Sequence, residues 1–205
     1  LGSPLVFQHR HNLMKVSQLP NLITVSRIAL APVLILLLKD QQYAAALAVF
    51  LVAGASDALD GWIAKRFKLV TRLGSILDPL ADKILLVSSY VMLTVLDQLP
   101  FWLTLSVVFR DLLIVSGYLA YTSMVGPVKM SPSNLSKFNT LMQIALIFAL
   151  LVQLAVPLSY PLLTEALFYI VFITTVASGV HYVWVWGFVK IKKVEKASAR
   201  GGVRG

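Results

Sequence analysis

Cysteine is missing from this chain altogether, and charged residues are scarce. None of the 205 residues is Cys, and only 13% are Asp, Glu, Lys or Arg. The first absence excludes a disulfide framework and any thiolate metal site. A metal would have to be held by oxygen or imidazole ligands instead. The second absence argues against an ordinary soluble domain, in which about 25% of the residues are charged.

The chain is rich in hydrophobic residues. They make up 58% of the chain, and the mean hydropathy is +0.81, a composition typical of membrane proteins. The net charge of +9 could suggest a nucleic-acid partner. However, the basic residues cluster in short segments between apolar runs and in the tail after Val189. We therefore interpret them as topology signals and lipid headgroup contacts, and expect no nucleic acid to bind.

Six apolar segments are long enough to cross a bilayer as helices, which takes about 20 residues each. They are 22–38, 43–64, 75–96, 101–123, 138–156 and 162–189. A short segment before them, 14–21, is expected to be an interfacial amphipathic helix. The sequence therefore predicts an all-α polytopic membrane protein with six transmembrane helices and an N-terminal interfacial helix.

The loops between these spans alternate in charge, and this alternation sets the orientation. Every second loop and the C-terminal tail are rich in Lys and Arg, whereas the other loops hold one Lys, Lys39, and no Arg. Both termini are therefore expected on the cytoplasmic or matrix side. We expect a membrane domain over 14–190 and a basic tail over 191–205. Residues 1–13 contain no apolar span, and since Met14 could be the native start, they are expected to be disordered or foreign to the native chain.

Two pairs of acids interrupt the second and third spans. Asp57 and Asp60 are three residues apart, and Asp78 and Asp82 are four apart, so each pair would share one face of a helix. Buried carboxylates are costly unless they are paired or bound to metal. Apart from Lys83, nothing basic lies on these faces, so divalent cations are expected. Hard oxygen ligands favour Mg²⁺ or Mn²⁺, and a pair of such ions is a recurring device for displacement at phosphorus.

Other interpretations of the intramembrane charges stay open on this reasoning. The acids could form buried salt bridges or line the ion path of a transporter. A transporter would usually show inverted repeats and acids spread along the path, and the sequence has neither. Arg110 and Asp111, in the middle of the fourth span, could form a local ion pair or contact a substrate. His181 beside Trp184 is expected in an aromatic interface belt rather than as a ligand.

Residues 57–82 read D-x2-D-G-x2-A-K-x8-G-x3-D-x3-D, which closely resembles the signature of the CDP-alcohol phosphatidyltransferases. One fixed position departs from it, because Lys65 stands where the family usually has arginine, which keeps the charge and loses the planar fork. The resemblance implies a membrane enzyme that transfers a phosphatidyl group from CDP-diacylglycerol to an alcohol and releases CMP. A non-catalytic member that binds CDP-lipid is the alternative, and the presence of all four Asp argues against it.

The resemblance also implies roles for individual residues. Metal ligands would be Asp57, Asp60, Asp78 and Asp82, with Asp82 also acting as general base on the acceptor hydroxyl. The CDP-lipid would be bound by Asn21, Asp57, Gly61, Ala64, Lys65, Arg66, Arg72, Gly74 and Ser75. Two divalent cations, a homodimer, and a bacterial or mitochondrial inner membrane with the active site facing cytoplasm or matrix are implied as well.

The acceptor alcohol is predicted by counting charges. The chain is similar to eukaryotic-type cardiolipin synthases and also to phosphatidylglycerophosphate synthases, which typically have Arg-Glu in place of Arg110-Asp111, followed by a further arginine. No basic residue occurs over 112–124, whereas glycerol 3-phosphate would need a dense basic pocket. Phosphatidylglycerol is therefore favoured, with Arg27, Arg110 and Lys137 as acceptor ligands. Glycerol 3-phosphate remains the alternative.

Overall fold

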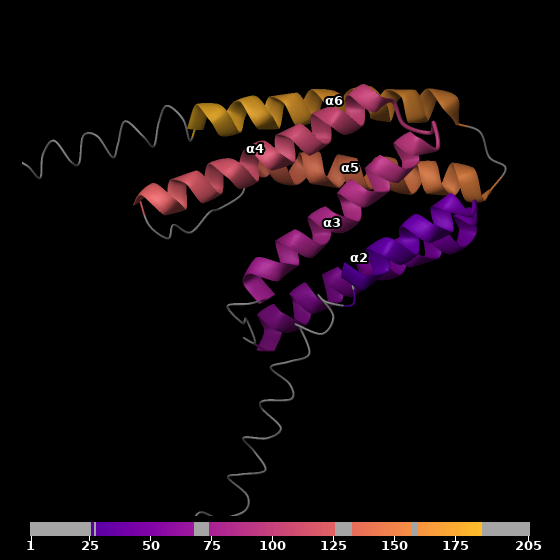
Figure 1. Cartoon of the computed structure of the whole chain (residues 1–205), viewed down its shortest axis with the longest axis horizontal. Helices are drawn as coiled ribbons and strands as arrows, with labels where there is room; N and C mark the ends of the chain where they lie inside the picture. The colour runs from indigo at the N-terminus through magenta and orange to yellow at the C-terminus, as the bar shows by residue number, and fades with distance from the viewer. Residues whose placement is uncertain (1–25, 27, 68–73, 126–132, 157–159, 186–205) are drawn as a thin grey trace, which may run out of the picture. The chain divides into compact units, whose positions relative to one another are not determined.

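The computed structural model describes residues 26, 28–67, 74–125, 133–156 and 160–185 (Figure 1). Only the backbone is described at 57, 58, 60–67, 74–82 and 118–125. Three predicted segments lie outside the described residues: the N-terminal segment 1–13, the interfacial helix over 14–21 and the basic tail over 191–205.

The described elements are all helices. A first helix, Ile28–Lys39, is followed by α2 (Tyr43–Phe67), α3 (Gly74–Val95), α4 (Phe101–Val125), α5 (Asn134–Ala155) and α6 (Pro161–Val183) (Figure 1). No strand occurs among the residues that the structure describes. The all-α prediction is confirmed for this part of the chain.

Two helices end in the same kind of left-handed turn. Gln41 follows the first helix with φ 56°, and Asp97 follows α3 with φ 57°. The residue after each of them donates its N–H to the carbonyl five residues earlier, at 2.8 and 2.9 Å respectively. This is the Schellman arrangement, which satisfies carbonyls that the end of a helix would leave without partners.

Helices α5 and α6 begin with recognisable local signals. Ser133 caps α5, since its hydroxyl accepts the N–H of Ser136 at 3.2 Å. Pro161 is the first residue of α6, where a missing N–H costs nothing. These signals depend on a few polar or cyclic residues rather than on hydropathy, and they set where each apolar helix begins.

The chain forms two compact units. Unit 1 comprises residues 1–98 and 147–159, and unit 2 comprises 99–146 and 160–205. Among the described residues, unit 1 contains the first helix, α2, α3 and the end of α5. Its buried apolar residues include Leu34, Leu38, Phe50, Tyr90 and Leu93.

Unit 2 consists, in its described part, of α4, the beginning of α5 and α6, with α4 packed along α6. Trp102 of α4 meets Phe172 of α6 edge to face, with 5.1 Å between ring centroids. Further along the two helices, a Cβ added at Gly117 would lie 2.9 Å from the Tyr182 hydroxyl. Glycine therefore allows the two helices to approach closely there.

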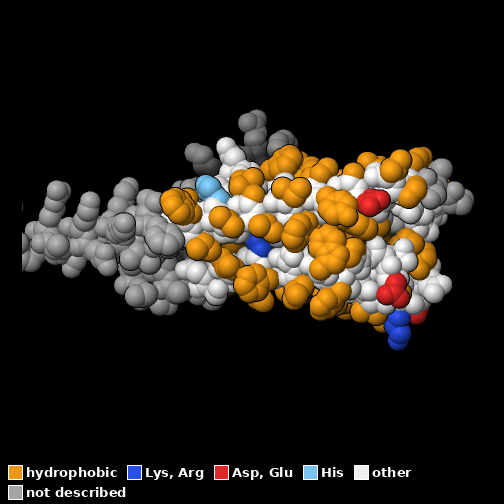
Figure 2. All heavy atoms as spheres, turned by 90° about the horizontal axis from the view of Figure 1, so that it is seen from above, with side chains coloured by type: hydrophobic (Ala, Val, Ile, Leu, Met, Phe, Trp, Pro, Cys, Tyr) orange, Lys and Arg blue, Asp and Glu red, His pale blue; other side chains and the backbone are white. Residues whose placement is uncertain are grey.

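Two described helices, α5 and α6, are long and apolar enough to cross a membrane, and three shorter helical stretches are apolar as well. Large hydrophobic side chains are also exposed, including Leu162 at 83% and Phe101 at 70%. Figure 2 shows hydrophobic side chains over most of the visible face, with few charged ones. A surface of this kind suits lipid rather than water. The apolar surface and the apolar helices support the interpretation as a membrane protein. The number of spans, six, stays a prediction.

Candidate functional site

The four predicted metal-binding acids lie on two helices. Asp57 and Asp60 belong to α2, and Asp78 and Asp82 belong to the first half of α3. Residues three or four apart share one face only if the backbone is helical, and the backbone is helical at both pairs. Among the side chains that the structure describes, no group of three His, Cys, Asp or Glu residues could hold a metal. The four Asp stay the predicted donor set, and their side chains lie outside the described part.

A proline interrupts the hydrogen bonding of α3 between its two acids. Pro79 is the sixth residue of the helix that begins at Gly74. It has no N–H to donate to the carbonyl of Ser75, a bond that an unbroken helix would contain. This end of α3 thus lacks one backbone hydrogen bond near the place where the CDP-lipid is predicted to bind.

The predicted CDP-lipid residues divide between described and undescribed segments. Helices α2 and α3 include the backbone of Asp57, Gly61, Ala64, Lys65, Arg66, Gly74 and Ser75. Asn21 and Arg72 lie outside the described residues, as does Arg27 of the predicted acceptor site. Lys137 is exposed in the first turn of α5. These assignments stay predictions.

Arg110 lies at the centre of a buried cluster in unit 2. Its Nη1 donates to Oδ1 of Asp111 at 2.8 Å, and its Nη2 donates to Oγ of Ser136 at 2.5 Å and to Oγ of Ser178 at 2.6 Å. The side chains of Arg110 and Asp111 are only 4% and 8% exposed. The cluster therefore joins α4, α5 and α6, and the local ion pair considered from the sequence is present.

The cluster does not use every donor of the guanidinium. Nε of Arg110 is buried and has no hydrogen-bond partner among the described residues. The stem of the same side chain runs beside Gly179, where an added Cβ would lie 3.6 Å from Cγ of Arg110. A buried guanidinium is stable only when its charge is balanced, and Asp111 supplies that charge. A contact between Arg110 and an acceptor stays a prediction.

A second polar contact continues this arrangement along α5 and α6. Oδ1 of the fully buried Asn139 accepts hydrogen bonds from the hydroxyls of Thr174 and Thr175, both at 2.9 Å. Asn139 follows Ser136 by three residues, and Ser178 follows Thr175 by three, so each pair lies on one helix face. Two apolar helices are thus joined by a line of polar contacts, of a kind that holds helices together in lipid.

The sequence reasoning did not assign Ser178, Thr174 or Thr175 to any site. A signal was available, because small polar residues at spacings of three on a long apolar helix mark a face that contacts another helix. The partner helix could not be read from that signal.

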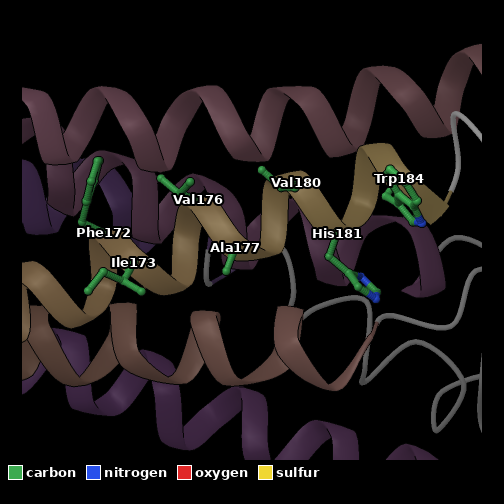
Figure 3. Close-up of a pocket in the computed structure, with 7 residues that line it drawn as sticks. All are labelled: Phe172, Ile173, Val176, Ala177, Val180, His181 and Trp184. Carbon is green, nitrogen blue, oxygen red and sulfur yellow. The ribbon is translucent and has the colours of Figure 1, made fainter.

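The outer face of α6 carries an apolar groove of about 590 Å³, lined by Phe172, Ile173, Val176, Ala177, Val180, His181 and Trp184 (Figure 3). His181 is exposed beside apolar neighbours. Among the described residues it forms no group with other metal ligands.

Comparison with known proteins identifies the family. The sequence model of the CDP-alcohol phosphatidyltransferases matches residues 17–180, a range that contains both acid pairs and the Arg110 cluster. The chain belongs to the CDP-alcohol phosphatidyltransferase family. The match covers most of the chain, so the family relationship is not limited to the short acidic signature.

Individual relatives fall into two groups. A fission yeast cardiolipin synthase (CMP-forming)/mitochondrial hydrolase fusion protein is 37% identical over 179 residues, which is 80% of this chain and 30% of the fusion protein. The human cardiolipin synthase (CMP-forming) is 34% identical over 80% of this chain and 60% of its own length. The CDP-diacylglycerol–glycerol-3-phosphate 3-phosphatidyltransferase of Bacillus subtilis is 31% identical over 84% of this chain and 97% of its own length.

The resemblance to cardiolipin synthases, with phosphatidylglycerophosphate synthases beside them, is thereby confirmed. The chain spans less than two thirds of the length of the yeast and human relatives.

Proposed function

We propose that this family member transfers the phosphatidyl group of CDP-diacylglycerol to phosphatidylglycerol, giving cardiolipin and CMP. The observation that carries the proposal is the D-x2-D-G signature on α2, continued by D-x3-D on α3, within a family match over residues 17–180. Similarity to proteins named as CMP-forming cardiolipin synthases supports the choice of reaction.

The chemistry is a displacement at phosphorus. The acceptor hydroxyl oxygen forms a bond to the β-phosphorus, which carries the diacylglycerol, while the bond from that phosphorus to the CMP oxygen breaks. CMP leaves with the electron pair. The hydroxyl proton passes to the carboxylate of Asp82, a transfer that requires hydrogen-bond reach of about 3 Å.

The four carboxylates suit divalent cations. Their donors are hard oxygens, and each pair is carried on helical backbone, which favours Mg²⁺ or Mn²⁺. The ligands would be Asp57, Asp60, Asp78 and Asp82. When bound, such ions supply positive charge for the attacking and leaving oxygens.

The remaining roles follow the signature and the charge distribution. Gly61 and Gly74 would let the cytidine diphosphate approach the helix backbone, and Lys65 and Arg66 would contact its phosphates. On the acceptor side, Arg27, Arg110 and Lys137 would bind the phosphate of phosphatidylglycerol, whose acyl chains can stay in the bilayer. The active site would face the cytoplasm or matrix across a bacterial or mitochondrial inner membrane, in a homodimer.

Glycerol 3-phosphate is the second candidate acceptor. The Bacillus subtilis relative, named for that substrate, aligns over 97% of its own length. Against it stands the absence of basic residues over 112–124, since a small doubly charged acceptor needs several cations.

The deciding experiment supplies purified protein with CDP-diacylglycerol and one alcohol at a time. Headgroup analysis of the lipid product separates the two candidates. Cardiolipin formed from phosphatidylglycerol supports the proposal. Phosphatidylglycerophosphate from glycerol 3-phosphate, without cardiolipin, rejects the acceptor and leaves the chemistry of the four Asp intact.

A further inference from the structure

We propose that Asp111 is a specificity-determining residue: by neutralising Arg110 in a span that has no further basic residue over 112–124, Asp111 makes the acceptor site prefer a singly charged phosphodiester over a doubly charged phosphate monoester. The inference rests on the proposed function for one point only, that Arg110 lies where the acceptor phosphate binds. The preference for a single negative charge is argued from the geometry of the Arg110 cluster.

The pair is held in one arrangement. Adjacent residues on a helix do not normally face each other, yet the guanidinium of Arg110 donates to the carboxylate of Asp111 at 2.8 Å. Hydrogen bonds to Ser136 on α5 and Ser178 on α6 fix the other terminal nitrogen. Arg110 is therefore oriented from three helices, and its ion pair is a built feature of unit 2 rather than a chance surface contact.

Asp111 decides how much charge this arrangement presents. The other two acceptors of Arg110 are neutral hydroxyls, so the negative charge beside the guanidinium comes from Asp111. Both side chains are more than nine-tenths buried, where screening by solvent is weak. To an approaching phosphate, the pair is close to neutral overall, and a second negative charge on the ligand gains little from it.

One N–H group of Arg110 is not used within the cluster and could donate a hydrogen bond to a phosphate oxygen. Nε of Arg110 is buried and without a hydrogen-bond partner among the described residues. A single N–H suits one phosphate oxygen, whereas a dianionic phosphate group is usually bound by several donors and cations. Charge balance and donor count thus point to the same ligand class, a phosphodiester with one negative charge.

The test removes the charge of Asp111 and keeps its shape. Asp111→Asn should raise the ratio of kcat/KM for glycerol 3-phosphate to kcat/KM for phosphatidylglycerol by at least about tenfold, because the uncompensated guanidinium of Arg110 would lie within hydrogen-bond distance of the phosphate, where Coulomb attraction favours the doubly charged ligand. Asp111→Glu keeps the charge and should leave the ratio near that of the wild type. A folded Asp111→Asn protein with an unchanged ratio would overturn the proposal.

A matched control is available in Asp97→Asn. Asp97 is exposed at the end of α3 with φ 57°, a conformation that asparagine tolerates well. The same chemical change there should not alter the ratio. An equal rise in both variants would mean that overall charge, and not the Arg110 pair, sets the preference, and would also overturn the proposal.

Wild-type protein provides a second measurement if Asp111→Asn fails to fold. The binding of glycerophosphoglycerol, a phosphodiester, and of glycerol 3-phosphate is compared by calorimetric titration. Tighter binding of the phosphodiester is expected, and the reverse order would contradict the proposal. If phosphatidylglycerol yields no cardiolipin, the proposed function fails, while this comparison still tests the preference for a singly charged phosphate.

Discussion

Arg110 of α4 donates a hydrogen bond of 2.6 Å to Ser178 of α6, although 68 residues separate them in the sequence. Neither residue is on a turn or a loop, and both are buried. The contact fixes the rotation of α6 about its axis relative to α4, since only one face of α6 carries Ser178. It also holds the only side chain of the fourth predicted span that could offer positive charge to a phosphate.

Ser178→Ala should therefore lower the stability of the protein. The substitution removes one hydrogen bond to a buried cation, and the expected loss is about 1 kcal/mol, because such bonds contribute less in membrane proteins than in water-soluble ones. Thermal unfolding in detergent measures it. The control is Ser116→Ala, since Ser116 is exposed and its hydroxyl donates, among the described residues, to the carbonyl of Leu113 in its own helix. Equal effects of the two substitutions would show that the contact between helices contributes nothing particular.

Gly117→Ala should disturb the packing of α4 on α6. The new Cβ would lie 2.9 Å from the hydroxyl of Tyr182 and 3.0 Å from its ring, so Tyr182 must shift, which disturbs its 3.1 Å hydrogen bond to the carbonyl of Ile114. We expect a loss of about 1 to 3 kcal/mol, measured by thermal unfolding.

The companion variant for this experiment is Gly54→Ala in α2. A Cβ at Gly54 meets no atom within 4 Å, and alanine has the higher helix propensity, so this protein should be equally or more stable. Loss of stability in Gly54→Ala with none in Gly117→Ala would contradict the packing described for unit 2.

Activity should require a divalent cation and stop in excess EDTA, because four clustered carboxylates would otherwise lack counter-charge. Asp78→Asn removes one of these charges and should weaken Mn²⁺ binding together with the rate. Calorimetric titration of Mn²⁺ into wild-type and variant protein measures the first effect independently of turnover. Transfer that continues in EDTA, or Mn²⁺ affinity unchanged in the variant, would refute the assignment of Asp78 as a ligand.

Asp82→Asn should separate binding from chemistry. An amide cannot accept the hydroxyl proton, so kcat should fall by about 10² to 10⁴, while binding of CDP-diacylglycerol should be retained to a greater extent. Calorimetry with a CDP-lipid and single-turnover kinetics distinguish the two effects. Abolished nucleotide binding with normal turnover of bound substrate would mean that the roles are assigned wrongly.

The helices could be predicted because long apolar segments, and the polar or cyclic residues at their ends, are visible in the sequence. Predicted spans 43–64, 75–96 and 101–123 correspond to α2, α3 and α4, with ends that differ by three residues or fewer. The fifth span was placed from 138, whereas α5 begins at Asn134. The difference has a physical cause: a hydropathy pattern misses a polar first turn, and here the Ser133 cap forms that turn.

The contacts between helices were not predictable in the same way. Arg110 and Asp111 are adjacent, so their ion pair could be considered from the sequence. Its continuation to Ser136 and Ser178 depends on how α5 and α6 are rotated about their axes, and a hydropathy pattern with apolar residues on all sides does not specify rotation. The acid pairs are different again, since their residue spacing alone predicts that each shares a helix face.

The most direct test of phosphatidyl transfer to phosphatidylglycerol is product analysis with purified protein in lipid bilayers. With CDP-diacylglycerol, phosphatidylglycerol and Mg²⁺ or Mn²⁺, we expect cardiolipin and CMP in equal amounts, with little of either from Asp82→Asn protein. No cardiolipin from this mixture, with phosphatidylglycerophosphate formed when glycerol 3-phosphate replaces phosphatidylglycerol, would contradict the proposed function.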